Sequence, residues 1–154
     1  MAAEKNNPGS DAIVSLRLLA ASCDEVFQAF SDPARLAQWW GPEGFTNSFR
    51  EFDFQPGGVW RFTMHGPDGT AYEMDHQFIE IARPERIVVR HIEPTHDFTL
   101  TITLAARHGG TEVTWNMRFA DAAEGERVRA FVVPANEQNF DRLAAHLSRT
   151  PAKS

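Results

Sequence analysis

His76 is the titratable residue with the clearest chemical potential. A turn at Gly66–Gly69 separates two segments that alternate between apolar and polar residues. If this hairpin pairs His65 with Ala71, then His76 lies opposite Trp60 on the apolar face. A histidine there can orient a ligand carbonyl or act as a general base near neutral pH. The alternative is a core histidine bonded to a neighbouring backbone or hydroxyl group, so we assign no catalytic residue.

Other familiar chemistries lack their sequence patterns. The six histidines are scattered, with neither HxxxH nor HExxH spacing, so we expect no bound metal. The chain has no Gly-x-Ser-x-Gly elbow and no glycine-rich phosphate loop, and we expect no cofactor. Its single cysteine, Cys23, excludes an internal disulfide. These patterns leave binding as the leading class of function.

Large apolar side chains accompany His76 on the same predicted face and on the neighbouring segments. Aromatic rings and methionines together suit a flexible apolar pocket. For each residue taken alone, the alternative is ordinary core packing. Any ligand pocket on this face is expected to be lined by Trp39, Trp60, Phe62, Met64, Met74, His76, Phe78, Phe98, Trp115, Met117 and Phe131.

The first third of the chain predicts a strand followed by two short helices. Residues 12–18 are rich in β-branched and apolar side chains, which favours a strand. Ser22 and Glu25 have the spacing of a capping box, which predicts a helix from Cys23. Asp32, followed by proline, predicts the N-cap of a second helix that ends at the glycine after Trp40.

Beyond residue 45 the apolar period changes from 3.6 to 2, which predicts five or six antiparallel strands. The alternating segments are residues 45–54, 59–65, 70–81, 87–92, 98–104 and 113–119. A long amphipathic helix is predicted over 123–148, with Phe131 in its apolar stripe. Pro134 lies inside it and predicts a kink or a break, because proline removes a helical hydrogen bond.

Composition limits the partners and the location. Fifteen basic and 21 acidic residues give a formal charge of −6 without any basic run, which argues against nucleic acid and anionic membranes. No apolar stretch approaches the ~18 residues of a membrane span. One cysteine and a polar start favour the cytoplasm. We expect a disordered leader at 1–10, one domain at 11–149 and a flexible tail at 150–154.

Several short motifs occur in an order typical of one superfamily. They are Val26–Pro33, Trp39–Pro42, Pro56–Phe62, Pro67–Gly69, Pro84–Ile87, Gly109–Thr111 and Asp141–Leu143. Over residues 12 to 148 the chain resembles the START-like superfamily with its helix-grip fold. Within it, the chain is similar to the family named after the activator of the ninety-kilodalton heat-shock protein ATPase. One departure is residues 135–140, where family members often carry a glycine-tryptophan pair.

The resemblance implies an α+β fold in which a curved antiparallel sheet wraps around a long C-terminal helix. It also implies an apolar cavity between sheet and helix, and hence a small-molecule-binding protein. Two alternatives stay open: a chaperone-associated stress-response interaction module, and a cyclase- or hydrolase-type enzyme that uses the same cavity. The sequence leaves a homodimer open as well.

Overall fold

A computed structural model describes residues 12–92 and 97–149. The predicted leader at 1–10 and tail at 150–154 lie outside the described residues. The elements, in chain order, are β1 (Ala12–Leu19), α1 (Cys23–Ser31), α2 (Pro33–Trp39), β2 (Thr46–Phe52), β3 (Val59–His65), β4 (Ala71–Ala82), β5 (Arg86–His91), β6 (Phe98–Arg107), β7 (Gly110–Phe119) and α3 (Ala122–Arg149).

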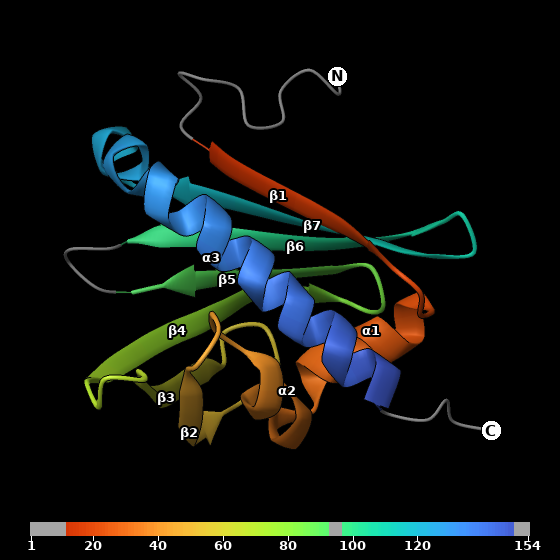
Figure 1. Cartoon of the computed structure of the whole chain (residues 1–154), viewed down its shortest axis with the longest axis horizontal. Coiled ribbons are helices and arrows are strands. Elements are labelled where there is room, and N and C mark those ends of the chain that lie inside the picture. Colours follow the sequence, from red (N-terminus) through yellow and green to blue (C-terminus); the bar gives the residue numbers. More distant parts are fainter. Residues whose placement is uncertain (1–11, 93–96, 150–154) are drawn as a thin grey trace.

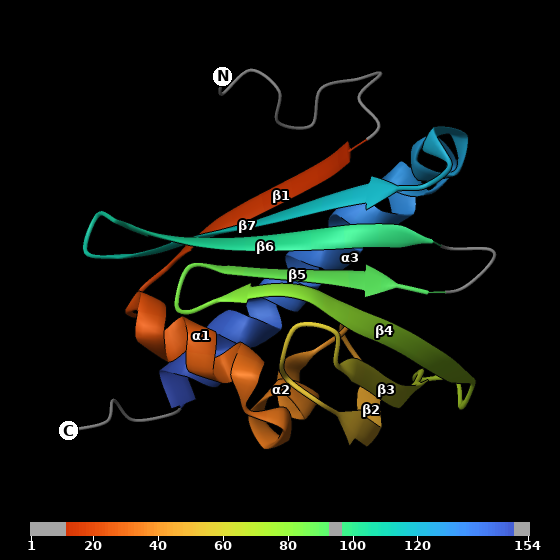
Figure 2. The same cartoon turned by 180° about the vertical axis from the view of Figure 1, so that it is seen from behind.

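The strands form one seven-stranded antiparallel sheet in the order β1-β7-β6-β5-β4-β3-β2. The long helix α3 crosses the concave face of this curved sheet, and α1 and α2 lie on the same side (Figures 1 and 2). Helix α3 packs on β1 and β7 and against α1 and α2. This is the α+β helix-grip architecture that the sequence predicts. No helix within residues 12–92 and 97–149 is long and apolar enough to cross a membrane.

Both short helices begin at the caps that the sequence predicts. The Ser22 hydroxyl accepts a hydrogen bond from the Glu25 backbone N–H at 3.1 Å, and the Glu25 carboxylate accepts one from the Ser22 N–H at 3.0 Å. An Asp32 carboxylate oxygen accepts from the Ala34 N–H at 3.0 Å, with proline at the first helical position of α2. These caps satisfy N–H groups that a helix start leaves unpaired.

The β3–β4 hairpin has the predicted register. His65 pairs with Ala71, and Trp60 pairs with His76. Because side chains alternate along a strand, this register turns the Trp60 and His76 side chains to the same face. Both are buried, so the hairpin carries the predicted aromatic face into the interior.

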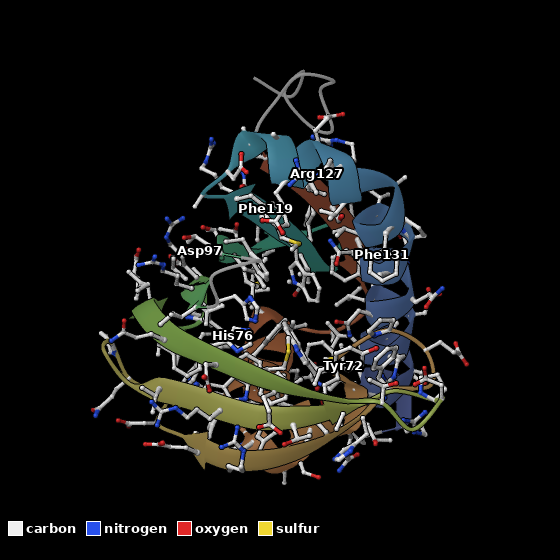
Figure 3. All side chains as sticks on the ribbon, turned by 90° about the vertical axis from the view of Figure 1, so that its left-hand side faces the viewer. Tyr72, His76, Asp97, Phe119, Arg127 and Phe131 are labelled. Carbon is white, nitrogen blue, oxygen red and sulfur yellow. The ribbon has the colours of Figure 1, made fainter. Side chains whose placement is uncertain are left out.

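Helix α3 is continuous through Pro134 but bent. Figure 3 shows its first turns, around Arg127, running at an angle to the stretch that follows Phe131. The bend follows from the proline ring, which conflicts with the carbonyl group four residues earlier, at Ala130. The predicted kink is confirmed and the alternative of a break is wrong.

The expectation that Phe131 faces the interior is wrong. Its side chain is 72% exposed. The buried stripe of α3 instead passes through Asn136 and Asn139 before it reaches Phe140. A stripe traced through apolar residues alone misses these two amides and is therefore shifted in phase over this part of the helix.

The backbone around Gly58, which lies in the turn before β3, is tightly packed. Its N–H donates to the Gln55 carbonyl, and its own carbonyl accepts from the Phe78 N–H. A Cβ at this position would overlap the Asp53 carbonyl oxygen. We expect Gly58→Ala to lower the free energy of unfolding in urea by about 1–3 kcal/mol, because backbone atoms must move.

The control is Gly109→Asn in the β6–β7 turn. Gly109 has a φ of 79°, which asparagine tolerates, and an added Cβ meets no described atom within 4 Å. We expect a loss of under about 1 kcal/mol, smaller than that of Gly58→Ala, because only the backbone φ is unfavourable and no backbone atom must move. Equal unfolding midpoints for both variants would contradict this account of the turn.

Candidate functional site

The indole of Trp40 lies at the centre of the aromatic interior. Its ring centroid is 5.2 Å from that of Trp60 and 5.4 Å from that of Trp115. Trp115 in turn contacts Phe140 of α3 at 4.7 Å. Because Trp60 lies on β3 and Trp115 on β7, Trp40 bridges distant parts of the sheet and links them to the helices.

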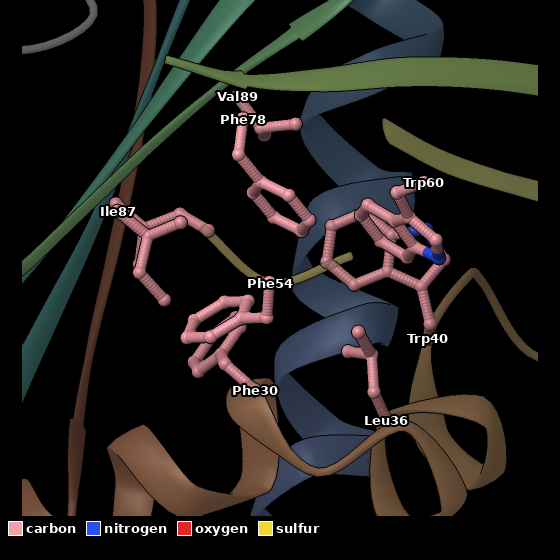
Figure 4. A pocket seen from close by; sticks show the side chains of 9 residues that line it. Phe30, Leu36, Trp40, Phe54, Trp60, Phe78, Ile87 and Val89 are labelled. Carbon is pink, nitrogen blue, oxygen red and sulfur yellow. The ribbon is translucent and has the colours of Figure 1, made fainter. Parts of the chain in front are cut away.

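A pocket beside Trp40 lies between the sheet and the two short helices (Figure 4). Its lining consists of Phe30, Leu36, Trp40, Phe54, Trp60, Phe78, Ile87, Val89 and Ile102. The empty space is about 10 Å³, room for about one water molecule. Small-molecule sites are usually hundreds of Å³. The open, ligand-sized cavity expected from the sequence is therefore not found at this position, because aromatic side chains fill it.

Several buried polar atoms in the described residues have no hydrogen-bond partner there. Those that matter for this interior include Nε1 of Trp60, Nε1 of Trp115 and Nδ1 of His76. The indole of Trp39, by contrast, donates to the Ala29 carbonyl at 3.1 Å. An unsatisfied buried donor costs about 1–3 kcal/mol, so native interiors contain few of them. The concave face thus carries two indole N–H groups and an imidazole nitrogen that could still form hydrogen bonds.

His76 is buried in a stack of rings. Its ring centroid lies 4.8 Å from that of Trp60, 5.5 Å from that of Phe62 and 4.8 Å from that of His91. Burial lowers the pKa of His76 well below its ordinary value, and the neighbouring His91 acts in the same direction, while a contact with the Trp60 backbone opposes them. The imidazole is therefore neutral at pH 7. A neutral ring can orient a carbonyl group, and the general-base role stays a prediction.

His91 extends this row of rings across the sheet. Its ring lies 4.9 Å from Phe98, which lies 5.2 Å from Phe119. Sequence patterns alone assign His91 little importance, because residues 87–92 are apolar on both faces of the strand. Only the pairing of His76 with His91 in the β4–β5 register reveals the position. Within the described residues, no group of three or more side chains could hold a metal ion.

Two polar residues of α3 fix the turn that carries Trp40. The Asn139 amide donates to the Trp39 carbonyl at 2.8 Å and accepts from the Gly41 N–H at 3.1 Å. The Arg142 guanidinium donates at 2.8–3.2 Å to the carbonyl oxygens of Gln38, Trp40, Gly41 and Pro42. In the sequence, the only signal for these contacts is that Asn139 and Arg142 are polar residues next to apolar positions of the helix.

Most of the predicted ligand-binding residues lie together on the concave face. These are Trp60, Phe62, Met64, Met74, His76, Phe78, Phe98, Trp115 and Met117. Phe131 is exposed, as described above. Trp39 packs against Phe30 at 4.9 Å, within the layer formed by α1 and α2. Its neighbour Trp40, which is not among the predicted site residues, contacts the sheet instead.

Comparison with known proteins identifies relatives by sequence family and by fold. The family described as Activator of Hsp90 ATPase homolog 1-like protein matches residues 20–148. Among curated proteins, no match to the chain is found.

Solved structures from several bacteria share the fold. A protein from Rhodobacter sphaeroides is 23% identical, with a TM-score of 0.84 over 94% of this chain and 97% of that one. One from Chromobacterium violaceum is 26% identical, with a TM-score of 0.76 over 92% and 99%. The protein named AHSA1 from Silicibacter pomeroyi is 21% identical, with a TM-score of 0.72 over 90% and 98%.

Burial of neutral His76 makes stability depend on pH. Its folded pKa lies below the unfolded value of about 6.5, so the unfolded state binds more protons as the pH falls. We expect the free energy of unfolding in urea to fall below pH 6.5, at up to about 1.4 kcal/mol per pH unit from this residue. His76→Phe should remove that part of the slope. His146, whose pKa burial also lowers, leaves a residual slope.

The matched control is His108→Asn. His108 is exposed in the β6–β7 turn with a φ of 55°, a conformation that asparagine accepts. It should leave the slope unchanged between pH 7.5 and 5.5. If the free energy of unfolding of His76→Phe falls with pH as steeply as that of the unmodified chain, the assignment of this pH dependence to His76 is contradicted.

Proposed function

We propose that this chain, which belongs to the family of Activator of Hsp90 ATPase homolog 1-like proteins, binds a small apolar or amphipathic molecule between its sheet and α3. Family and fold support a ligand-binding or chaperone-associated module in general terms. One observation favours the ligand: buried, unpaired indole N–H groups of Trp60 and Trp115 on an aromatic concave face. A bound molecule would supply the missing acceptors.

The side of the molecule between β4 and α3 is the proposed entrance. In Figure 3, His76 lies on β4, Tyr72 lies nearer to α3, and Phe131 lies on α3 itself. Tyr72 is 45% exposed, and Phe131 is largely exposed. Exposed large apolar side chains that rim a buried aromatic face are typical of ligand and partner sites.

Binding requires side chains to move, because the pocket beside Trp40 is nearly full. Met64 and Met74 lie on neighbouring residue pairs of the β3–β4 face, and both are half-buried. Methionine has three rotatable bonds and fills irregular gaps, so it can yield to a ligand without backbone change. The Met64 and Met74 side chains can therefore change rotamer to admit a ligand, while the neighbouring aromatic rings stay in place.

Met74→Glu tests this site. A carboxylate at a half-buried position on the inward face should repel an apolar probe and weaken binding of N-phenyl-1-naphthylamine, followed by fluorescence, at least ten-fold. Ile79→Glu on the same strand is the control, because Ile79 is largely exposed, and it should leave affinity unchanged. Equal affinities for both variants would contradict the proposal.

Mass spectrometry of a denatured extract of the purified chain provides a second measure. We expect an amphipathic molecule to be released from the unmodified chain and to be depleted in Met74→Glu. Absence of any released molecule, together with no probe binding, would overturn the ligand-binding proposal.

The chaperone-associated module rests on the description of the family. Measuring the ATP turnover of an Hsp90-type chaperone with and without this chain distinguishes this hypothesis from ligand binding. Unchanged turnover and no association in a pulldown would remove it. The cyclase- or hydrolase-type activity requires His76 as the base and stays a prediction.

A further inference from the structure

We propose that the ligand is a flat, neutral molecule with a carbonyl oxygen. This oxygen accepts hydrogen bonds from the indoles of Trp60 and Trp115, and the body of the ligand takes the position of the Trp40 indole. This inference rests on the proposed function and names the chemistry of its ligand. It combines three observations on the described residues: two unpaired donors, the occupied guanidinium groups of Arg17 and Arg142, and the contacts of Trp40 with both rings.

The two donors determine the polar group of the ligand. Trp60 and Trp115 are each 2% exposed, and neither Nε1 has a partner among the described residues. An indole N–H can only donate, so the missing partner must be an acceptor. Trp39, whose N–H is bonded to a carbonyl, shows that a buried indole of this same interior can be satisfied by the protein. An oxygen acceptor on the ligand would complete the other two.

The charges around the cluster favour a neutral acceptor over a carboxylate. Trp60 contacts Phe49 and His76, whose imidazole is neutral at pH 7, and Trp115 contacts the Phe140 ring. The guanidinium of Arg142 is occupied by four carbonyl oxygens. Arg17 lies over the Phe140 ring but is paired with two carboxylates. A ligand carboxylate at the two indoles would therefore find both of these guanidinium groups already occupied, whereas a carbonyl needs no counter-charge.

Trp40 indicates the size and shape of the ligand. Its ring touches the rings of both donors, and at 9% exposure it is less buried than either. Its backbone is anchored, because its N–H donates to the Leu36 carbonyl and its carbonyl accepts from Asn47 and Arg142. Displacement therefore means rotation of the indole rather than movement of the turn. The vacated space suits a bicyclic aromatic body.

Trp40→Ala opens this space for three probes of nearly equal shape. The probes are 2-acetylnaphthalene, 2-isopropenylnaphthalene, which has a methylene group in place of the oxygen, and 2-naphthoate. We expect the ketone to bind at least ten-fold more tightly than the carboxylate. Adding Trp60→Phe or Trp115→Phe should shift the ratio of ketone to alkene affinity about ten-fold toward the alkene, since each removes one donor. Adding Trp39→Phe is the control and should leave the ratio unchanged.

If Trp40→Ala does not fold, the unmodified chain can be titrated with 2-acetylnaphthalene instead. The indole N–H signals in NMR then show whether the ketone accepts hydrogen bonds from Trp60 and Trp115. The Trp60 and Trp115 protons should move downfield as they become hydrogen-bonded, while the Trp39 proton stays in place. Trp60 and Trp115 signals that do not move at saturating ketone overturn the proposal. A ratio of ketone to alkene affinity that neither Trp60→Phe nor Trp115→Phe changes overturns it as well.

Failure of the proposed function gives a different result. In that case the unmodified chain releases no molecule on denaturation and does not bind N-phenyl-1-naphthylamine. If it binds that probe but the ketone, alkene and carboxylate bind Trp40→Ala equally, ligand binding stands and the carbonyl chemistry is wrong.

Discussion

The contact of the Trp40 indole with Trp60 and Trp115 is the interaction on which the interior depends. A helix of seven residues, α2, cannot by itself cover a curved sheet. Its C-cap residue extends an indole of about 150–250 Å² across the concave face and joins β3 to β7. The turn after it is fixed by Asn139 and Arg142 of α3, so sheet, short helix and long helix meet at one side chain.

Local rules account for much of what the sequence predicts correctly. The capping box at Ser22 and the N-cap at Asp32 are short-range signals, which depend on residues within three positions of each other. The β3–β4 register follows from one turn and a period of two, so the partners of Trp60 and Phe62 follow from the amino-acid sequence alone. Family resemblance then supplies the helix-grip arrangement that no local pattern contains.

The errors share one physical cause, which is that burial does not follow hydrophobicity residue by residue. Asn139 is buried because its amide satisfies two backbone groups, whereas the apolar Phe131 on the same helix is exposed. Trp39 and Trp40 are equally apolar, yet backbone direction at the helix end separates their environments. Whether an aromatic face encloses a cavity depends on which neighbour rotates into it, and composition does not determine that.

The unpaired indoles bear on why this interior is aromatic rather than aliphatic. Phenylalanine would pack as an apolar ring at either strand position without burying a donor, so two unsatisfied N–H groups are avoidable. At about 1–3 kcal/mol each they consume a large part of the roughly 5–15 kcal/mol that stabilises a typical domain. A core selected for stability alone would not contain them. They lie beside Trp40, the most exposed tryptophan of this cluster, and the proposed exchange of its indole for a ligand would offset their cost.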